Sequence, residues 1–342
     1  MLSRTVAALT LTAGLLIAAS GAAAETADGG TLGGDGVTVS PLLVVGDPAG
    51  TPPDSPDAHV DANVPTSRYS GVGAVRSNVY GGSYYLGSGV LISPRHVLTA
   101  GHMIDINANG TIDFAAGEVS FYVNNGETPT VIAAVDLVLH PDFTGFDNPV
   151  VNDDLAIITL AEDAPAGVAI YPLWTAAVTA GTQTLLVGYG RSGNGVSGYT
   201  TSAALTVKRV GANVIDGFEE DDEGEAGSGI HEVWLADFDG PTADTNLLGG
   251  LTLGNSVETA LGTGDSGGAT FIEVDGQIYL VGINTFGYRE DGYPAVPYYG
   301  SGLGGMLVES YVPWINTVVP EPVSMGLLAV GLAGIALRRR GR

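Results

Sequence analysis

The chain has 342 residues, a formal net charge of −25 and no cysteine. A field of that sign repels nucleic acid and anionic membranes, so the charge excludes a nucleic-acid-binding protein. The lack of cysteine excludes disulfides, a cysteine nucleophile and thiolate-bound metals.

The first 24 residues have the order of a secretory signal peptide. Arg4 precedes an apolar run over residues 6–19, and small residues then lead to Ala24. This order predicts export across the inner membrane, with a signal peptidase cutting after Ala24.

Residues 25–68 form a lead segment rich in Gly, Pro and Asp. Its apolar patch is short, at residues 42–45, and little else in it can be buried. A segment with so little apolar area cannot offset the entropy of folding. The composition therefore predicts an extended or disordered lead or pro-segment.

Residues 69–319 consist mainly of short apolar runs separated by Gly, Asn, Asp and Pro. These runs are rich in Val, Ile, Leu and Thr, which is typical of half-buried strands. They lie at residues 89–92, 97–100, 131–139, 155–160, 185–189 and 278–283. One short helix is expected at the end, where Tyr311, Ile315 and Val318 recur at spacings of four and three, with Pro313 near its first turn. The pattern predicts an all-β fold, either sandwich or barrel.

Residues 320–342 form a second terminal signal. Pro320-Glu321-Pro322 precedes an apolar run over residues 323–337, and arginines follow. As a helix that run would span about 22 Å, short of a hydrocarbon core of about 30 Å. The order resembles the PEP-CTERM sorting signal of Gram-negative bacteria. The resemblance implies cutting by an exosortase-type enzyme, with the protein then secreted or held at the cell surface or extracellular matrix.

Three segments carry residues suited to nucleophilic catalysis. His102 ends an apolar strand, Asp154 directly precedes another, and Ser266 stands in a Gly-rich turn. A serine hydroxyl is a weak nucleophile until an imidazole takes its proton, and a buried carboxylate fixes the imidazole tautomer. Asp153 competes for the carboxylate role, and Asp154 is preferred because it adjoins the strand.

The segments Thr99-Ala100-Gly101-His102, Asp154-Leu155-Ala156-Ile157 and Gly264-Asp265-Ser266-Gly267-Gly268 resemble the trypsin/chymotrypsin family of serine proteases. The resemblance covers residues 69–319 and implies a double β-barrel of chymotrypsin type, with barrels at about residues 69–170 and 171–319. It implies a catalytic triad of His102, Asp154 and Ser266, and an oxyanion hole formed by the N–H groups of Gly264 and Ser266. The implied activity is endopeptidase hydrolysis of proteins or peptides through an acyl-enzyme, with no cofactor required for the chemistry.

The resemblance also supplies candidates for substrate binding. Thr285, Phe286 and Gly287 match the family strand that pairs with the substrate backbone. Ala260 stands six residues before the serine, where trypsin-type enzymes carry an aspartate. Without that charge, a preference for Lys or Arg is not expected.

Activation by cleavage is an open alternative at Arg68. Arg68 stands where members of the family are activated by cleavage. The sequence after it reads Tyr69-Ser70-Gly71-Val72 and departs from the usual I-V-G-G. Arg68 is otherwise a solvated loop residue.

Residues 105–113 match a calcium loop of EF-hand type. The oxygen ligands would be Asp105, Asn107, Asn109 and Asp113, with a glycine at the sixth position. The twelfth position lacks the usual glutamate. The loop predicts a structural calcium ion, and the alternative is an Asn/Gly-rich surface turn.

An acidic run at residues 219–225 has the composition of a solvated surface insertion. Together with the sorting tail it leaves a second function open. The chain could use the same fold as a catalytically inactive or calcium-dependent protein of the surface or extracellular matrix.

Overall fold

The computed structural model describes residues 43–79, 82–145, 152–224, 227–288, 294 and 297–319. The predicted signal peptide and sorting tail lie outside the described residues. Within the described part, none of the helices is long and apolar enough to cross a membrane.

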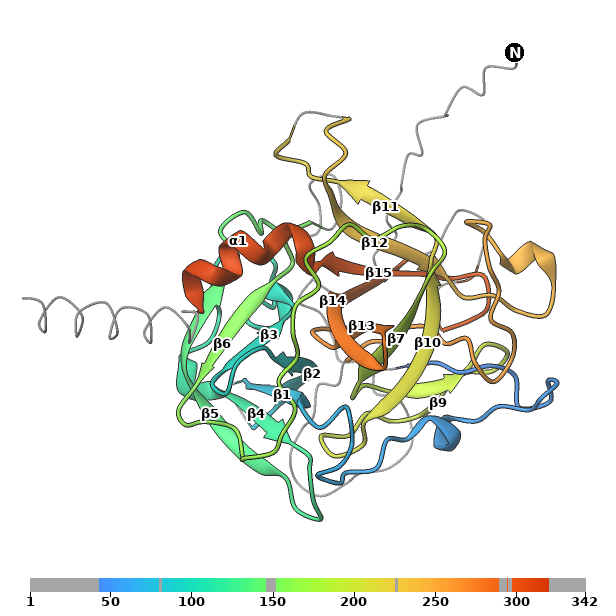
Figure 1. The fold of residues 1–342 in the computed structure, drawn as a ribbon. Coiled ribbons are helices and arrows are strands. Elements are labelled where there is room, and N and C mark those ends of the chain that lie inside the picture. The colour runs from blue at the N-terminus through green and yellow to red at the C-terminus, as the bar shows by residue number, and fades with distance from the viewer. Residues whose placement is uncertain are drawn as a thin grey trace, which may run out of the picture.

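The first half of the body is a closed barrel of six antiparallel strands in the order β1-β2-β3-β6-β5-β4 (Figure 1). Burial alternates along β4, where Val119, Phe121 and Val123 are fully buried, because successive side chains of a strand point to opposite faces. The strands are β1 (Val72–Asn78), β2 (Tyr84–Leu91), β3 (His96–Thr99), β4 (Val119–Val123), β5 (Thr130–Leu139) and β6 (Ala156–Leu160).

The second half is a seven-stranded antiparallel sheet in the order β10-β7-β13-β14-β15-β12-β11. Its strands are β7 (Thr182–Gly188), β10 (Arg209–Ile215), β11 (Gly217–Glu220), β12 (His231–Asp237), β13 (Ala269–Val274), β14 (Gln277–Tyr288) and β15 (Gly302–Leu307). A two-stranded hairpin, β8 (Ser192–Asn194) and β9 (Gly198–Thr201), and the short 3-10 helix η4 (Ala243–Thr245) complete this part. Of the other 3-10 helices, η1 (Pro56–His59) precedes β1, and η2 (Gly101–Met103) and η3 (Ala116–Glu118) lie between β3 and β4 of the first half. The all-β, trypsin-like fold expected from the sequence is confirmed, with the first barrel closed and the second half a single large sheet.

The expected terminal helix is α1 (Val308–Val318), drawn in red in Figure 1. It begins earlier than the sequence indicated, so Pro313 lies inside the helix and not in its first turn. Pro313 is exposed, where water can bond the carbonyl that the missing N–H leaves unpaired. Tyr311 and Ile315 are buried and fix the helix to the body.

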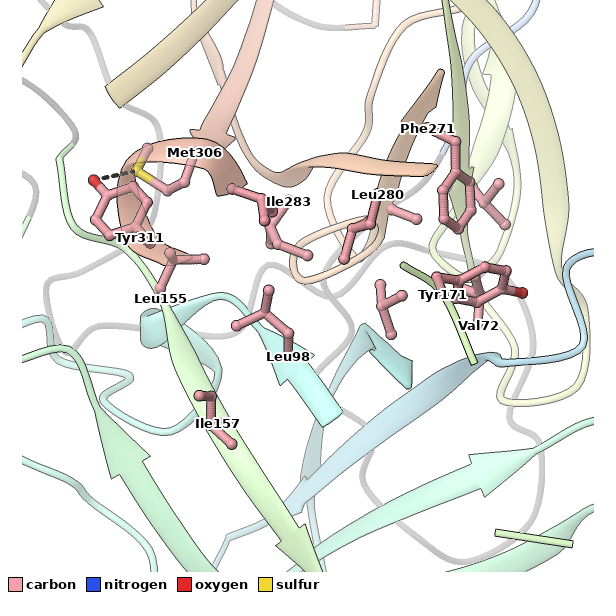
Figure 2. Packing of buried hydrophobic residues seen from close by; sticks show 14 of the residues in the cluster. Val72, Leu98, Leu155, Ile157, Tyr171, Phe271, Leu280, Ile283, Met306 and Tyr311 are labelled. Carbon is pink, nitrogen blue, oxygen red and sulfur yellow. Dashed lines mark hydrogen bonds between the residues drawn. The ribbon is translucent and has the colours of Figure 1, made fainter. Parts of the chain in front are cut away.

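One apolar core joins the two halves (Figure 2). Leu98 and Leu155 enter it from the first barrel, and Leu280 and Ile283 from the second sheet. Each of these side chains is fully buried. The strand ends that carry the candidate site residues are therefore held by shared packing between the halves.

The lead segment is ordered from Leu43 onward, so the prediction of disorder is wrong for residues 43–68. Leu43, Val44 and Val45 are fully buried. The N–H of Val44 donates to the Ala260 carbonyl at 2.8 Å, and the Ala260 N–H donates to the Val44 carbonyl at 2.9 Å. The apolar patch is short, but strand-like pairing with a distant segment lets the second half bury it (blue in Figure 1).

Replacing Leu43 by Ala should lower the free energy of unfolding by about 2–5 kcal/mol, the usual cost of truncating a buried leucine. Chemical denaturation of the chain from residue 25 onward measures this. Val64→Ala is the control, because Val64 belongs to the same segment and is 41% exposed. Equal stability of the two variants would contradict the packing of the lead.

Candidate active site

His102 and Asp154 lie in direct contact. The Nδ1 atom of His102 is 2.7 Å from Oδ2 of Asp154, and the backbone N–H of His102 donates to Oδ1 at 2.8 Å. Asp154 is fully buried, and the His102 side chain is 16% exposed. The carboxylate therefore fixes both the ring and the backbone of the histidine.

The adjacent Asp153 faces a different partner. Its Oδ1 lies 3.2 Å from Nδ1 of His140, and its backbone N–H donates to the Tyr311 hydroxyl at 3.2 Å. Asp153 has φ at 55°, in the left-handed region, which turns its side chain away from the direction taken by Asp154. Of the two neighbouring aspartates, Asp154 is the one that pairs with His102.

Ser266 stands in a tight turn whose glycines adopt positive φ. Gly264 has φ at 114° and Gly267 at 80°, values that other residues rarely adopt. A Cβ on Gly267 would collide with Thr99 Oγ1 and the Ser88 carbonyl. The serine turn thus lies so close to the strand that leads to His102 that only a glycine fits at position 267.

The buried Ser88 of β2 ties this turn to the first barrel. Its N–H donates to the Ser266 carbonyl at 2.8 Å, and its hydroxyl donates to the Gly264 carbonyl at 2.8 Å. The Ser88 carbonyl accepts from Thr99 Oγ1 at 2.7 Å. Since Thr99 ends β3 shortly before His102, these bonds bring the histidine and serine segments together.

The N–H groups proposed for an oxyanion hole belong to Gly264 and Ser266. Within the described part of the chain no hydrogen bond from either N–H to another group is found. Donors left free beside a serine hydroxyl are what stabilisation of an oxyanion requires.

The candidate substrate-binding residues belong to the second half of the body. Ala260 is fully buried, and its backbone pairs with Val44. Thr285 and Phe286 are buried in β14, where the pairing register with β15 shifts between Asn284 and Phe286. Gly287 follows in the same strand and is half-buried. Their contact with substrate stays a prediction.

Asp265 is fully buried beside Gly188 and accepts the Gly262 N–H at 3.2 Å. Burial raises the pKa of its carboxyl well above the usual range. Near the family's activation position, Arg68 pairs with Glu273 at 2.9 Å. Cleavage after Arg68 stays a prediction.

The predicted calcium loop is internally hydrogen-bonded. The Asp105 carboxylate accepts the N–H groups of Asn109 at 3.2 Å and Gly110 at 2.7 Å. Asp113 accepts the side-chain amide of Asn107 at 2.6 Å. These bonds are those of a polar turn, and calcium at this loop stays a prediction.

Sequence reasoning missed Ser88 and Tyr311 as supports of the site. Ser88 is flanked by glycines, which signals close backbone approach, but nothing in the sequence names its partners. Tyr311 was predicted only as a core residue of the helix. Its hydroxyl contact with Asp153 depends on how the last helix returns to the loop before β6.

Comparison with known proteins gives two family matches. Residues 61–224 match the family model Trypsin. This stretch of the chain is similar to the trypsin family. Residues 318–340 match the PEP-CTERM protein-sorting motif, which indicates export and sorting in Gram-negative bacteria.

The trypsin-family match includes His102 and Asp154 and ends before Ser266. Over 86 residues the chain is 35% identical to the venom serine protease Bi-VSP of Bombus ignitus. That similarity covers 25% of this chain and 22% of the venom protein.

Replacing Ser88 by Ala should lower the free energy of unfolding by about 1–3 kcal/mol, because the Gly264 carbonyl and the Tyr189 N–H lose a buried partner. Thermal and chemical denaturation measure the change. The exposed Ser202→Ala serves as the matched control. If the two variants unfold alike, the Ser88 hydroxyl contributes nothing to holding the serine turn.

Proposed function

We propose that the chain is an exported serine endopeptidase with His102, Asp154 and Ser266 as its catalytic triad. The observation that supports it best is the contact of 2.7 Å between His102 Nδ1 and the buried Asp154 carboxylate. A pair of this kind holds Nε2 ready to accept a proton, and the serine turn is bonded to the adjoining strands through Ser88.

In the proposed reaction the Ser266 hydroxyl attacks the scissile carbonyl and its proton passes to His102 Nε2. The N–H groups of Gly264 and Ser266 bind the oxyanion that forms. His102 then gives the proton to the leaving amine, which departs and leaves an acyl-enzyme. Water, deprotonated by His102, releases the acid and restores the serine. The chemistry needs no cofactor.

The trypsin-family domain implies a protein substrate, and the PEP-CTERM motif implies processing by an exosortase. We further propose that a signal peptidase removes residues 1–24, and that the protein is secreted or stays at the cell surface or matrix. The proposed protease domain extends over residues 69–319, with the ordered lead packed against it.

Ser266→Ala and His102→Ala should each abolish peptide hydrolysis and leave the β-rich fold intact, because both changes are small and remove a reacting group. Asp154→Asn should lower kcat by about 10⁴-fold, since the amide favours the wrong imidazole tautomer. Rates on a peptide library, with circular dichroism for the fold, measure both effects.

Asp163→Asn is the control for Asp154→Asn, because it makes the same change at an aspartate whose side chain is 68% exposed. It should retain most of the activity. Covalent labelling of wild type by an active-site organophosphate, lost in Ser266→Ala, provides a second readout. Substantial hydrolysis by Ser266→Ala would overturn the triad, and an unlabelled, inactive wild type would favour the surface-protein alternative.

Specificity follows from the uncharged residue at position 260. The enzyme should prefer small or apolar residues before the scissile bond, because Ala260 supplies no carboxylate to bind Lys or Arg. Values of kcat/KM for peptides that differ only at that position test this. A strong preference for basic residues would show that the pocket is formed by other groups.

A further inference from the structure

Four carboxylates from three separate segments converge beside the loop that carries Asp154. Asp153 precedes β6, Asp222 and Glu223 belong to the acidic run after β11, and Glu232 begins β12. One carboxylate oxygen from each lies within 4.8 Å of the others. The connection between β11 and β12 extends from the sheet at the top of Figure 1. The acidic run expected to be a solvated insertion therefore reaches the active-site loop.

Two members of this cluster are buried among like charges. Asp153 is 2% exposed and Glu232 is 8% exposed. Burial, followed by the charges of Glu223 and Asp222, raises the pKa of Asp153 to about 7. Burial, followed by the charge of Asp153, raises the pKa of Glu232 to about 8. Gathering these groups costs free energy that a cation would offset.

The nearest nitrogen base does not supply that cation. His140 Nδ1 is 3.2 Å from Asp153 Oδ1, without hydrogen-bond geometry. Burial lowers the pKa of His140 and so disfavours its charged form. The rings of Tyr311 and Trp314 make T-shaped contacts with the imidazole, with centroids at 5.1 Å and 4.7 Å.

A second observation, besides the convergence of the carboxylates, also points to a ligand: two buried oxygens at the cluster lack a hydrogen-bond partner among the described residues. Glu232 Oε2 has no hydrogen-bond partner among the described residues. Asn152, 5% exposed, donates from Nδ2 to Asp222 Oδ1 at 2.8 Å, and its own Oδ1 has no partner there either. Buried acceptors are normally satisfied, so these oxygens point to a group that the chain does not supply.

The donor set selects among cations. All the candidate ligands are oxygens, which Ca²⁺ accepts at about 2.3–2.6 Å and in sets of six to eight. Oxygens on opposite sides of such an ion lie about 5 Å apart, and the oxygens of the cluster all lie within 4.8 Å of one another. The exposed Asp222 and Glu223 leave room for water to complete the shell.

We propose that Asp153, Asp222, Glu223 and Glu232 form a binding site for a divalent cation of the calcium class. Bound there, the ion ties the β11–β12 connection to the residue next to Asp154. It acts as a positioning device for the active-site loop and takes no part in bond making. The site is separate from the loop at residues 105–113.

The test measures calcium binding to the chain from residue 25 onward, after treatment with a chelator. All variants carry Ser266→Ala, so self-cleavage does not contribute and the outcome is independent of the proposed protease activity. Calorimetric titration with CaCl₂ gives affinity and stoichiometry, and melting temperatures are recorded in chelator, in calcium and in magnesium at matched ionic strength.

Glu232→Gln should weaken calcium binding at least tenfold. In chelator this variant should melt at or above its parent, because glutamine is neutral and avoids the cost of burying a carboxyl group among like charges. In calcium it should melt below its parent, because a ligand of the ion is lost. Glu219→Gln, with the same charge change on the same hairpin, should behave as the parent. Asp222 is an exposed residue of the same cluster, so Asp222→Asn provides a second test if Glu232→Gln fails to fold.

Three outcomes would overturn the proposal. The first is equal calcium affinity in the parent, Glu232→Gln and Asp222→Asn. The second is an equal gain in melting temperature from magnesium and calcium in every variant, which is the general screening of a highly acidic protein. The third is binding lost in Asp113→Asn but kept in Glu232→Gln, which places the ion in the loop at residues 105–113.

Discussion

The hydrogen bonds of Ser88 hold the serine turn against the strands that lead to the histidine. The two halves of the molecule share an apolar core, but such packing tolerates small shifts and has no preferred direction. The fully buried Ser88 donates to the Gly264 and Ser266 carbonyls at 2.8 Å. Its own carbonyl accepts from the Thr99 hydroxyl at 2.7 Å. Together these bonds fix the approach of the turn. The glycine at 267 is required because any side chain there would separate these bonded partners.

Asp154 receives support from the opposite direction through α1. The helix follows the second sheet, and the Tyr311 hydroxyl accepts a hydrogen bond from the Asp153 N–H. Trp314 of the same helix packs on His140. The last element of the described chain thus fixes the loop before β6. Both parts of the site therefore depend on contacts across the two halves. Ser88 of β2 holds the serine turn, and Tyr311 of α1 holds the residue next to Asp154.

Much of this arrangement could be predicted from local sequence, because the residues that perform chemistry sit in short segments with specific neighbours. The segment from Thr99 to His102 and the glycine turn at Ser266 were found in this way, and so was the choice between Asp153 and Asp154 as the partner of His102. The all-β fold followed from the apolar runs. The structure brings His102 and Asp154 together, and the triad itself is a proposal.

What the sequence did not indicate depends on pairing between distant segments. Leu43 to Val45 look like an isolated patch in a polar lead, and backbone pairing with Ala260, Gly193 and Gly195, far along the chain, lets them be buried. The acidic run likewise has the composition of a solvated loop. Yet Asp222 and Glu223 of this run lie close to Asp153, together with Glu232 near the start of β12. Local composition predicts neither contact, since each is decided by tertiary topology.

The position of the sorting motif has a consequence for the length of the tether. The motif begins at residue 318, which is also the last residue of α1. A flexible spacer of ten residues would reach about 35 Å, but here the folded domain and the recognition sequence share a residue. The processing enzyme must therefore work in direct contact with a folded surface, or wait until the final helical turn unwinds. Tyr311 lies two turns earlier, so the contact that supports the active-site loop can persist through either event.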